Sequence, residues 1–134
     1  MRNSFFTLMI MITLAACSNY VFDLRGKFDE SVTKYNQLYR WSEFDAASVF
    51  FVDPLREDFR ARINAAKNVK IVDYRLLSTL YDEARRKAIV EVEIEYHFLS
   101  TAKVKTLRDT QEWEYREEQG TKGWRLISLL PEFK

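Results

Sequence analysis

The chain carries two kinds of hydrophobic pattern, and the change between them comes just after Asn68. Before that point apolar residues recur every three or four positions, which is the spacing of a half-buried helix. Asp29 is a suitable N-cap for a first helix, and Ser42 resembles the start of a capping box for a short second one. The Asp53-Pro54 pair suits the start of a third helix, because proline is well tolerated in a first turn. We expect this third helix to end near Asn68.

After this change the period is two, which predicts strands with one buried face. The clearest alternation has apolar residues at Ala88, Val90, Val92, Ile94, Tyr96 and Phe98. Weaker alternations predict further strands around Val72 to Leu76, Leu107 to Tyr115 and Trp124 to Leu130, with a turn at Gly120 to Gly123. Helices followed by such strands predict an α+β fold. In this fold, N-terminal helices pack on a curved antiparallel sheet of four or more strands.

The hairpin between the second and third strands has a predicted register. A turn centred on Thr101-Ala102 places Glu95 opposite Arg108, so that opposite charges meet on the outer face. A register shifted by one residue would instead put Arg108 beside Ile94 on the buried face, and the first register is therefore preferred. The predicted pairs are Glu95 with Arg108, Val90 with Trp113, and Ala88 with Tyr115.

The first residues have the parts of a secretory signal. Met1-Arg2-Asn3 is short and basic, Phe5 to Leu14 is almost wholly apolar, and small residues follow before Cys17. The apolar run is too short to span a bilayer, which takes about 20 residues. We therefore expect residues 1–16 to be a signal peptide.

The end of this signal resembles the bacterial lipobox. Leu14-Ala15-Ala16-Cys17 matches it at every position, and Cys17 is the only cysteine in the chain. The resemblance implies cleavage before Cys17, attachment of lipid to its sulfur, and acylation of the new amino group. Ser18 stands where an aspartate would resemble an inner-membrane retention signal, which favours the outer membrane, facing the periplasm, in a Gram-negative host. The alternative is an ordinary signal peptide with a chance cysteine.

The rest of the chain is predicted to be one domain on a short tether. Residues 17–27 would form the lipidated cysteine and the tether, and residues 28–134 the single domain. The sequence is 47% hydrophobic and 15% aromatic, which is enough for a core without disulfides. With 21 Lys and Arg against 20 Asp and Glu, it has no basic excess for nucleic acid, and we expect none to bind. The expected partners are a membrane, through the N-terminal lipid, and an envelope protein or a small apolar ligand.

Two further stretches resemble the nuclear transport factor 2-like (SnoaL-like) superfamily, whose domains are cone-shaped. Trp41-Ser42-Glu43-Phe44-Asp45-Ala46-Ala47 followed by Val52-Asp53-Pro54 is similar to its helix and Asp-Pro stretch, and Gly123-Trp124-Arg125-Leu126-Ile127 is similar to its last hairpin. The resemblance covers roughly Phe28 to Glu132. The superfamily includes isomerases, dehydratases, cyclases, transport adaptors and periplasmic subunits of secretion machines, so the fold does not choose a function. A cystatin-like arrangement is the main alternative fold.

Asp109 and Gln111 are the most informative polar residues, because the predicted register places them on the apolar face. Polar groups buried there need hydrogen bonds to protein, water or a ligand. Three interpretations of the cone follow. It is a filled core in which Asp109 is bonded to protein, or it is a ligand pocket, or it is a catalytic site. The candidate pocket residues are Tyr74, Tyr96, Asp109, Gln111, Trp113, Tyr115 and Trp124.

Other polar residues carry weaker signals. His97, the only histidine, shares the expected outer face with Glu91, Glu93 and Glu95, and a solvated strand explains this set better than catalysis or metal binding. Arg85-Arg86-Lys87 fits a solvated turn, or a contact with acidic lipid or a partner. The sequence holds no HExxH, GxSxG, P-loop or CxxC motif, and we expect neither a cofactor nor a metal.

Two functions follow from these observations. The first is a membrane-anchored periplasmic lipoprotein whose domain is a non-enzymatic binding or assembly module. The second is an isomerase- or dehydratase-like enzyme with Asp109 as base. A filled cone favours the first, whereas an open cone with a raised Asp109 pKa favours the second.

Replacing Cys17 with serine tests the anchor. We expect Cys17→Ser to leave an unprocessed or soluble protein without lipid, because the thioether forms on the cysteine sulfur. Labelling growing cells with an alkyne fatty acid measures this, and equal labelling of wild type and variant would contradict the lipobox assignment.

Overall fold

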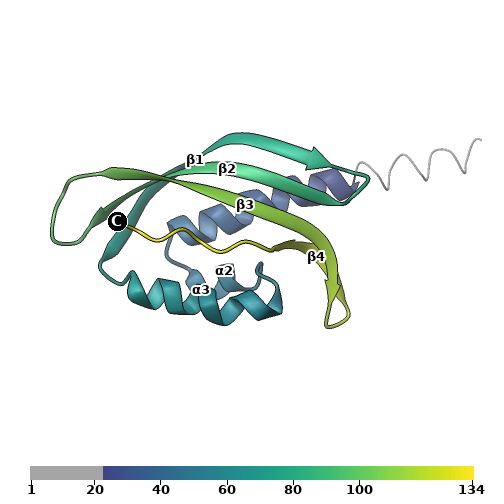
Figure 1. Cartoon of the computed structure of the whole chain (residues 1–134), viewed down its shortest axis with the longest axis horizontal. Coiled ribbons are helices and arrows are strands. Elements are labelled where there is room, and N and C mark those ends of the chain that lie inside the picture. The colour runs from purple at the N-terminus through teal and green to yellow at the C-terminus, as the bar shows by residue number, and fades with distance from the viewer. Residues whose placement is uncertain (1–22) are drawn as a thin grey trace, which may run out of the picture.

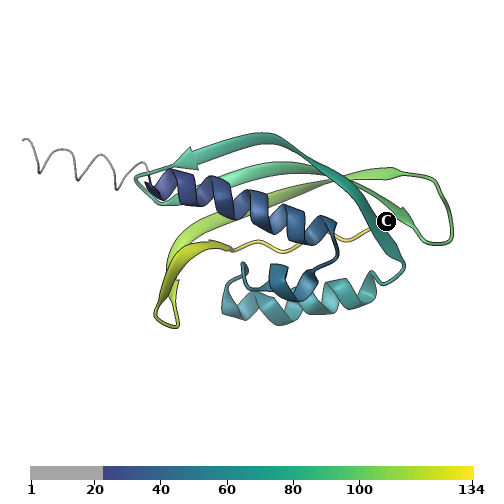
Figure 2. The ribbon, with the colours of Figure 1, turned by 180° about the vertical axis from the view of Figure 1, so that it is seen from behind.

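The computed structural model describes residues 23–134, and the expected signal peptide and Cys17 lie outside them. In the described residues three helices precede a four-stranded antiparallel sheet, which confirms the expected α+β class. The helices are a first helix, whose described residues are 23–40, then α2 (Phe44–Ser48) and α3 (Asp53–Ala65). All three lie on the same side of the sheet (Figures 1 and 2).

The sheet is a meander of long strands. Its strands, in their order across the sheet, are β1 (Val69–Asp82), β2 (Lys87–Phe98), β3 (Lys105–Glu118) and β4 (Thr121–Leu126). β1 carries two bulges, at Val72 and Leu77, where one residue of β1 has no partner in β2. Bulges bend a strand and increase its twist, and the sheet curves over the helices (Figure 1).

The core lies between the inner face of the sheet and the helices. The alternation expected for β2 is confirmed, since its buried residues are Ala88, Val90, Val92, Ile94 and Tyr96. The helices contribute Phe28, Val32, Tyr35, Tyr39 and Phe59 to the same cluster. Aromatic rings fill its middle, where the ring centroid of Tyr35 lies 5.9 Å from that of Trp113 and 5.6 Å from that of Phe51. These edge-on contacts are the arrangement that aromatic rings prefer.

The inward phase expected for β3 is confirmed, but its expected register against β2 is wrong. The observed pairs are Glu93 with Arg108, Val90 with Gln111, and Ala88 with Trp113, so each β3 partner is displaced by two residues. A shift of two keeps every side chain on its face, which is why burial alone did not reveal it. Although Glu93 lies opposite Arg108 in this register, its side chain forms an ion pair with Arg75 of β1, and Glu93 Oε1 lies 2.9 Å from Arg75 Nη2.

The loop between β2 and β3 explains the shift. The Thr101 amide donates to the Phe98 carbonyl at 3.1 Å, so the chain turns directly after β2. Residues 101–104 are then neither helix nor strand, and pairing resumes at Lys105. The loop is therefore asymmetric, whereas the expected turn was centred on Thr101-Ala102.

The first helix already includes residues that were expected in the tether. Residues 23–27 are helical, and Leu24 is buried. The Leu24 carbonyl oxygen also accepts a hydrogen bond from Trp124 Nε1 at 3.2 Å. Leu24 lies four residues before the buried Phe28, so it adds one more position to the apolar stripe of the helix.

The ends of α2 and α3 also differ from expectation. Glu43, and not Ser42, is the N-cap of α2, and it forms no side-chain capping bond. Ser42 instead has a φ of 60°. α3 begins at Asp53 as expected but ends at Ala65, before Asn68. The Asn68 carbonyl accepts a bond from the Leu99 amide at 2.7 Å, so this segment already pairs with the end of the β2 region.

The last hairpin turns earlier than its glycines indicated. Gln119 and Gly120 form the turn with φ values of 51° and 77°, the left-handed pair that a two-residue hairpin needs. Gly123 lies within β4, which ends at Leu126 and not at Leu130. The segment before α3 bonds to the backbone of Leu126, and the chain leaves the sheet there.

Phe59 is the position of α3 whose loss tests this packing. Its side chain is fully buried, and its ring stacks on Phe51 with a centroid distance of 4.4 Å. We expect Phe59→Ala to lower the free energy of unfolding by about 3–5 kcal/mol, because it removes buried surface and leaves a cavity. Urea unfolding measures this, with the exposed neighbour Asp58→Ala as control, for which about 0.5 kcal/mol or less is expected. A loss below about 1 kcal/mol for Phe59→Ala would contradict the placement of α3 on the sheet.

Candidate functional site

The candidate site lies on the inner face of β3, in the middle of the core. Strand alternation turns Asp109 and Gln111 toward the helices together with Trp113, and their exposed fractions are 3%, 1% and 0%. The first helix places Asn36, which is 1% exposed, against the same region. The burial expected for Asp109 and Gln111 is therefore confirmed.

Gln111 is the centre of a hydrogen-bonded network. Its Nε2 donates to Asn36 Oδ1 at 2.8 Å and to Asp109 Oδ2 at 3.0 Å. Its Oε1 accepts from Asn36 Nδ2 and from Trp113 Nε1, both at 3.3 Å. Asn36 Nδ2 also donates to the Val32 carbonyl at 2.9 Å. Both amide groups are thus satisfied by protein atoms, as buried polar groups require.

The Asp109 carboxyl is the unusual member of this network. Burial raises its pKa to about 6, although the hydrogen bond from Gln111 opposes the rise and the Glu91 charge adds to it slightly. Burial has this effect because removing a carboxylate from water disfavours its charged form. Asp109 can therefore hold or release a proton near neutral pH, which is a property of general bases but also of buried structural acids.

Two tyrosines from the first helix lie near this carboxyl. Tyr35 and Tyr39 are stacked with ring centroids 6.2 Å apart. Burial, and then the charge of Asp109, raise the pKa of both phenols well above the usual range. Both are therefore neutral hydroxyls. The Tyr39 hydroxyl is buried and has no hydrogen-bond partner among the described residues.

The expected pocket residues do not converge on one space. Trp113 joins the network, whereas Trp124 lies beside Tyr115 at 5.6 Å and bonds to the first helix. Tyr96 is near the other end of β2, where its hydroxyl donates to the Lys134 carbonyl at 2.6 Å. Tyr74 is only partly buried on the edge strand β1. The set therefore follows the length of the sheet.

Sequence reasoning missed Asn36 and the two tyrosines beside it. A signal was present, because Val32, Tyr35, Asn36 and Tyr39 share the spacing of one helix face. A polar residue within an apolar stripe needs a buried partner, so the stripe could have marked Asn36 as a buried polar residue. Its partner lies 75 residues away, so the pairing itself depends on the fold.

The outer face of the sheet holds the other polar candidates. His97 Nδ1 lies 2.9 Å from the Phe98 carbonyl oxygen and 3.1 Å from that of Thr101, so it contacts the loop after β2. Glu91 accepts a bond from Thr110 at 2.8 Å. The described residues contain no group of three or more His, Cys, Asp or Glu side chains that could hold a metal ion.

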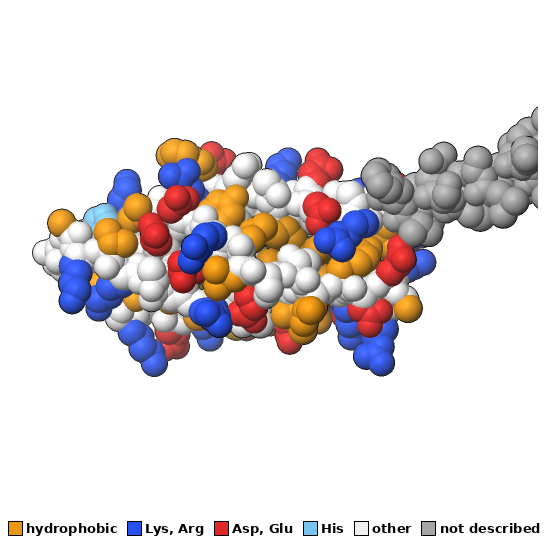
Figure 3. Space-filling view, turned by 90° about the horizontal axis from the view of Figure 1, so that it is seen from above, with side chains coloured by type: hydrophobic (Ala, Val, Ile, Leu, Met, Phe, Trp, Pro, Cys, Tyr) orange, Lys and Arg blue, Asp and Glu red, His pale blue; other side chains and the backbone are white. Residues whose placement is uncertain are grey.

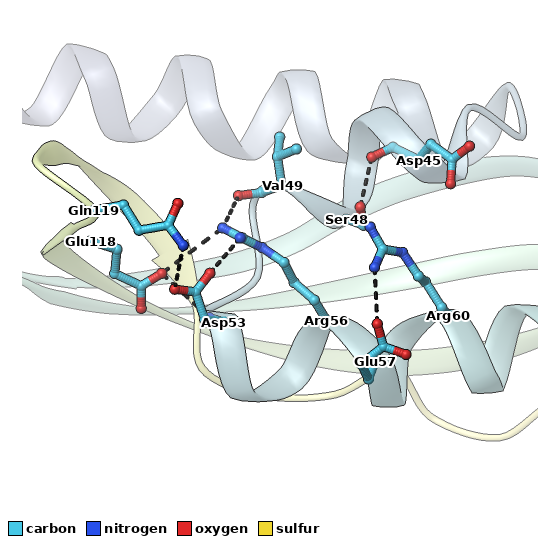
Figure 4. A network of polar contacts seen from close by, with 9 residues as sticks. All are labelled: Asp45, Ser48, Val49, Asp53, Arg56, Glu57, Arg60, Glu118 and Gln119. Atoms are coloured by element: carbon cyan, nitrogen blue, oxygen red, sulfur yellow. Dashed lines mark hydrogen bonds and ion pairs between the residues drawn. The ribbon is translucent and has the colours of Figure 1, made fainter.

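A second polar cluster joins the start of α3 to the β3–β4 hairpin (Figure 4). Arg56 forms an ion pair with Asp53 and lies 3.9 Å from Glu118. Gln119 Nε2 donates to Asp53 Oδ2 at 3.3 Å, and the Asp53 amide donates to Glu118 at the same distance. Arg56 thus lies between two carboxylates, one on α3 and one on the hairpin, and these contacts hold the hairpin against the helix.

The surface of residues 23–134 has several hollows, and Asp109 lines neither of the following two. One, of about 360 Å³, lies between the end of α3 and the C-terminal segment and includes Arg62 and Phe133. The other, of about 430 Å³, lies at the β1–β2 hairpin and includes Leu80 and Ile89.

Comparison with known protein families finds none that matches the chain, and a search of curated proteins finds no similar sequence. Within residues 23–134 no helix is both long enough and apolar enough to cross a membrane.

Replacing Asp109 with asparagine tests the buried acid. Because the folded state raises its pKa from 3.8 to about 6, the fold favours the protonated form, and its stability falls as the pH rises between these values. Asn keeps the shape without the charge. We expect Asp109→Asn to raise the free energy of unfolding by about 1–3 kcal/mol at pH 7, with no gain near pH 4.

Urea unfolding of both proteins between pH 4 and pH 8 measures this difference. Asp58→Asn on the exposed side of α3 is the matched control, and its profile should follow the wild type. Parallel profiles for Asp109→Asn and the wild type over the whole range would contradict the raised pKa.

Proposed function

We propose that this chain is a lipoprotein of the bacterial envelope whose domain is a non-enzymatic binding or assembly module. One observation carries the second half of the proposal. Asp109 and Gln111, the polar residues with which a cone pocket would do chemistry, are bonded to each other and covered by protein. A site for catalysis would have to present such groups to a substrate.

The lipobox Leu14-Ala15-Ala16-Cys17 supports the anchored half of the proposal. Two or more acyl chains hold a protein stably on a membrane, whereas one binds marginally. Ser18 favours the outer membrane, with the domain facing the periplasm. A cone-shaped domain of the nuclear transport factor 2-like kind fits the order of helices and strands, and we retain it as part of the proposal.

The surface, rather than the interior, would then contact the partner. Several large hydrophobic side chains of the described residues are more than half exposed, namely Trp41, Val49, Leu80, Leu99 and Val104. Exposed apolar side chains that gather in patches are typical of surfaces that bind proteins, membranes or apolar ligands.

The second candidate is an isomerase- or dehydratase-like enzyme with Asp109 as base. The observation that favours it is the raised pKa of this residue, since general bases work best near the pH of their surroundings. This candidate requires the aromatic core to open, because a base must come within hydrogen-bonding distance of its substrate.

Asp109→Asn separates the two candidates when the anchor is kept intact. We expect the lipidated wild type and Asp109→Asn to be cross-linked to the same envelope proteins in living cells, and to copurify with the same small molecules. Cys17→Ser, the control without an anchor, should lose these cross-links. Mass spectrometry of the purified adducts and extracts measures both.

A small molecule that is retained by Asp109→Asn and not by the wild type would contradict the non-enzymatic role. Loss of the base would then have trapped a substrate that the wild type converts and releases. Cross-links that persist unchanged in Cys17→Ser would contradict the need for the anchor.

A further inference from the structure

The β1–β2 hairpin lies beside the point where the chain enters the domain. The Arg25 guanidinium stands over the Tyr81 ring, 4.5 Å from its centroid, and the Phe28 ring lies 5.3 Å from the same ring. Two opposite views show this hairpin next to the near end of the first helix (Figures 1 and 2). An anchor attached a few residues before residue 23 would therefore hold this end of the domain.

The outer face of the sheet carries an apolar hollow at the same end. Leu80 and Ile89 lie directly opposite each other in β1 and β2, and they are 68% and 38% exposed. Together with Ile127 they line a hollow of about 430 Å³, which we call the hairpin hollow. Figure 3 looks onto the sheet and shows a strip of hydrophobic side chains in the half of the face nearest the entering chain.

Cationic side chains stand around the hairpin hollow. Arg85 and Lys87 line it, together with the acidic Asp82 and Glu112. Their ion pairs are long, because Arg85 lies 3.7 Å from Asp82 and Lys87 lies 4.0 Å from Glu114. Exposed ion pairs of this kind contribute little to the free energy of unfolding, so Arg85 and Lys87 can exchange their acidic partners for others. Arg86, in the same turn, makes no ion pair with a described side chain and lies over the Tyr115 ring.

We propose that the hairpin hollow rests on the surface of the lipid bilayer in which the chain is anchored. Leu80 and Ile89 lie at the boundary between headgroups and acyl chains, and Arg85 and Lys87 contact headgroup phosphates. This inference rests on the proposed lipidation of Cys17. It adds that one face of the domain is held on the membrane and that the opposite end is presented to partners.

The length of the preceding chain favours a lipid surface over other occupants. Cys17 comes six residues before Asp23, and six residues reach at most about 20 Å when fully extended. The hairpin hollow is therefore kept within reach of the bilayer at all times. An apolar side chain with cationic neighbours is also the combination found on protein surfaces that lie in the membrane interface.

The β2–β3 loop provides a matched comparison, because Leu99 is as exposed as Leu80, at 63%. Leu99 lies at the other end of β2, roughly 30 Å from Ile89 at the rise of a strand. Exposure alone would predict the same behaviour for both leucines. The proposal predicts contact with lipid for Leu80 and none for Leu99.

The experiment uses the full chain, processed and lipidated in cells, then reconstituted into vesicles of phosphatidylethanolamine and phosphatidylglycerol. Leu80→Cys, Ile89→Cys and Leu99→Cys each provide one thiol for a fluorescent maleimide, since the lipid thioether blocks Cys17. We expect spin-labelled lipids to quench the probes at positions 80 and 89, at a depth of roughly 5–10 Å in the interface. The probe at position 99 should remain in water and unquenched.

Equal quenching at positions 80 and 99, or none at either, would overturn the proposal. Shielding at position 80 that appears only when the protein is crowded in the vesicle would also overturn it, because a second copy would then cover the hollow. Maleimide labelling of the wild type would show a free Cys17 thiol, and this result would contradict the proposed lipoprotein itself. Ile89→Cys keeps the test valid if Leu80→Cys does not fold.

Discussion

The contact between the first helix and β3 holds the whole domain together, and its centre is polar. Gln111 on the strand and Asn36 on the helix exchange hydrogen bonds in both directions inside an aromatic core. Such a pair allows one relative position of helix and sheet, because a shift would leave two buried amides unsatisfied. The apolar contacts around it supply most of the stability, since burial of hydrophobic surface is the dominant favourable term in folding. The amide pair therefore contributes mainly to the alignment.

The same contact determines what Asp109 can do. The carboxyl is brought into the core with Gln111, because residues two apart in a strand share a face. Its raised pKa follows from that burial and needs no ligand to explain it. A perturbed carboxyl in this position lowers the stability of the fold at neutral pH, and at 3% exposure Asp109 is closed to a substrate in this structure.

The β1–β2 hairpin and the β2–β3 loop, at opposite ends of the sheet, both carry exposed leucines but have different neighbours. Leu80 and Leu99 are similarly exposed at opposite ends of the β2 region, but only Leu80 is next in the chain to Tyr81, which contacts Arg25 and Phe28 at the start of the described residues. A lipid anchor before residue 23 would hold only the end with Leu80 near the membrane, although both ends carry an exposed leucine. We infer that the membrane-near end orients the domain and that the far loop and the helical side are available to partners.

Periodicity alone predicted the α+β class, the strand faces and the burial of Asp109, Gln111 and Trp113. It could do so because the spacing of apolar residues records which side chains avoid water, whatever they pack against. The lipobox was predicted from adjacent residues alone, and it stays a prediction because Cys17 lies outside the described residues. The register of β3 could not be read in this way, because a shift of two residues leaves every face unchanged.

The tertiary structure decided the remainder, which depends on segments that are distant in the sequence. The loop after Phe98 set the register, and Asn68 and Leu126 form backbone hydrogen bonds with Leu99 and with the segment before α3. The pairing of Asn36 with Gln111 joins residues 75 positions apart, and local patterns contain no information about such a distance. The seven expected pocket residues were spread along the sheet for the same reason. A local pattern determines the face on which a side chain lies, whereas only the closed fold determines which side chains meet it.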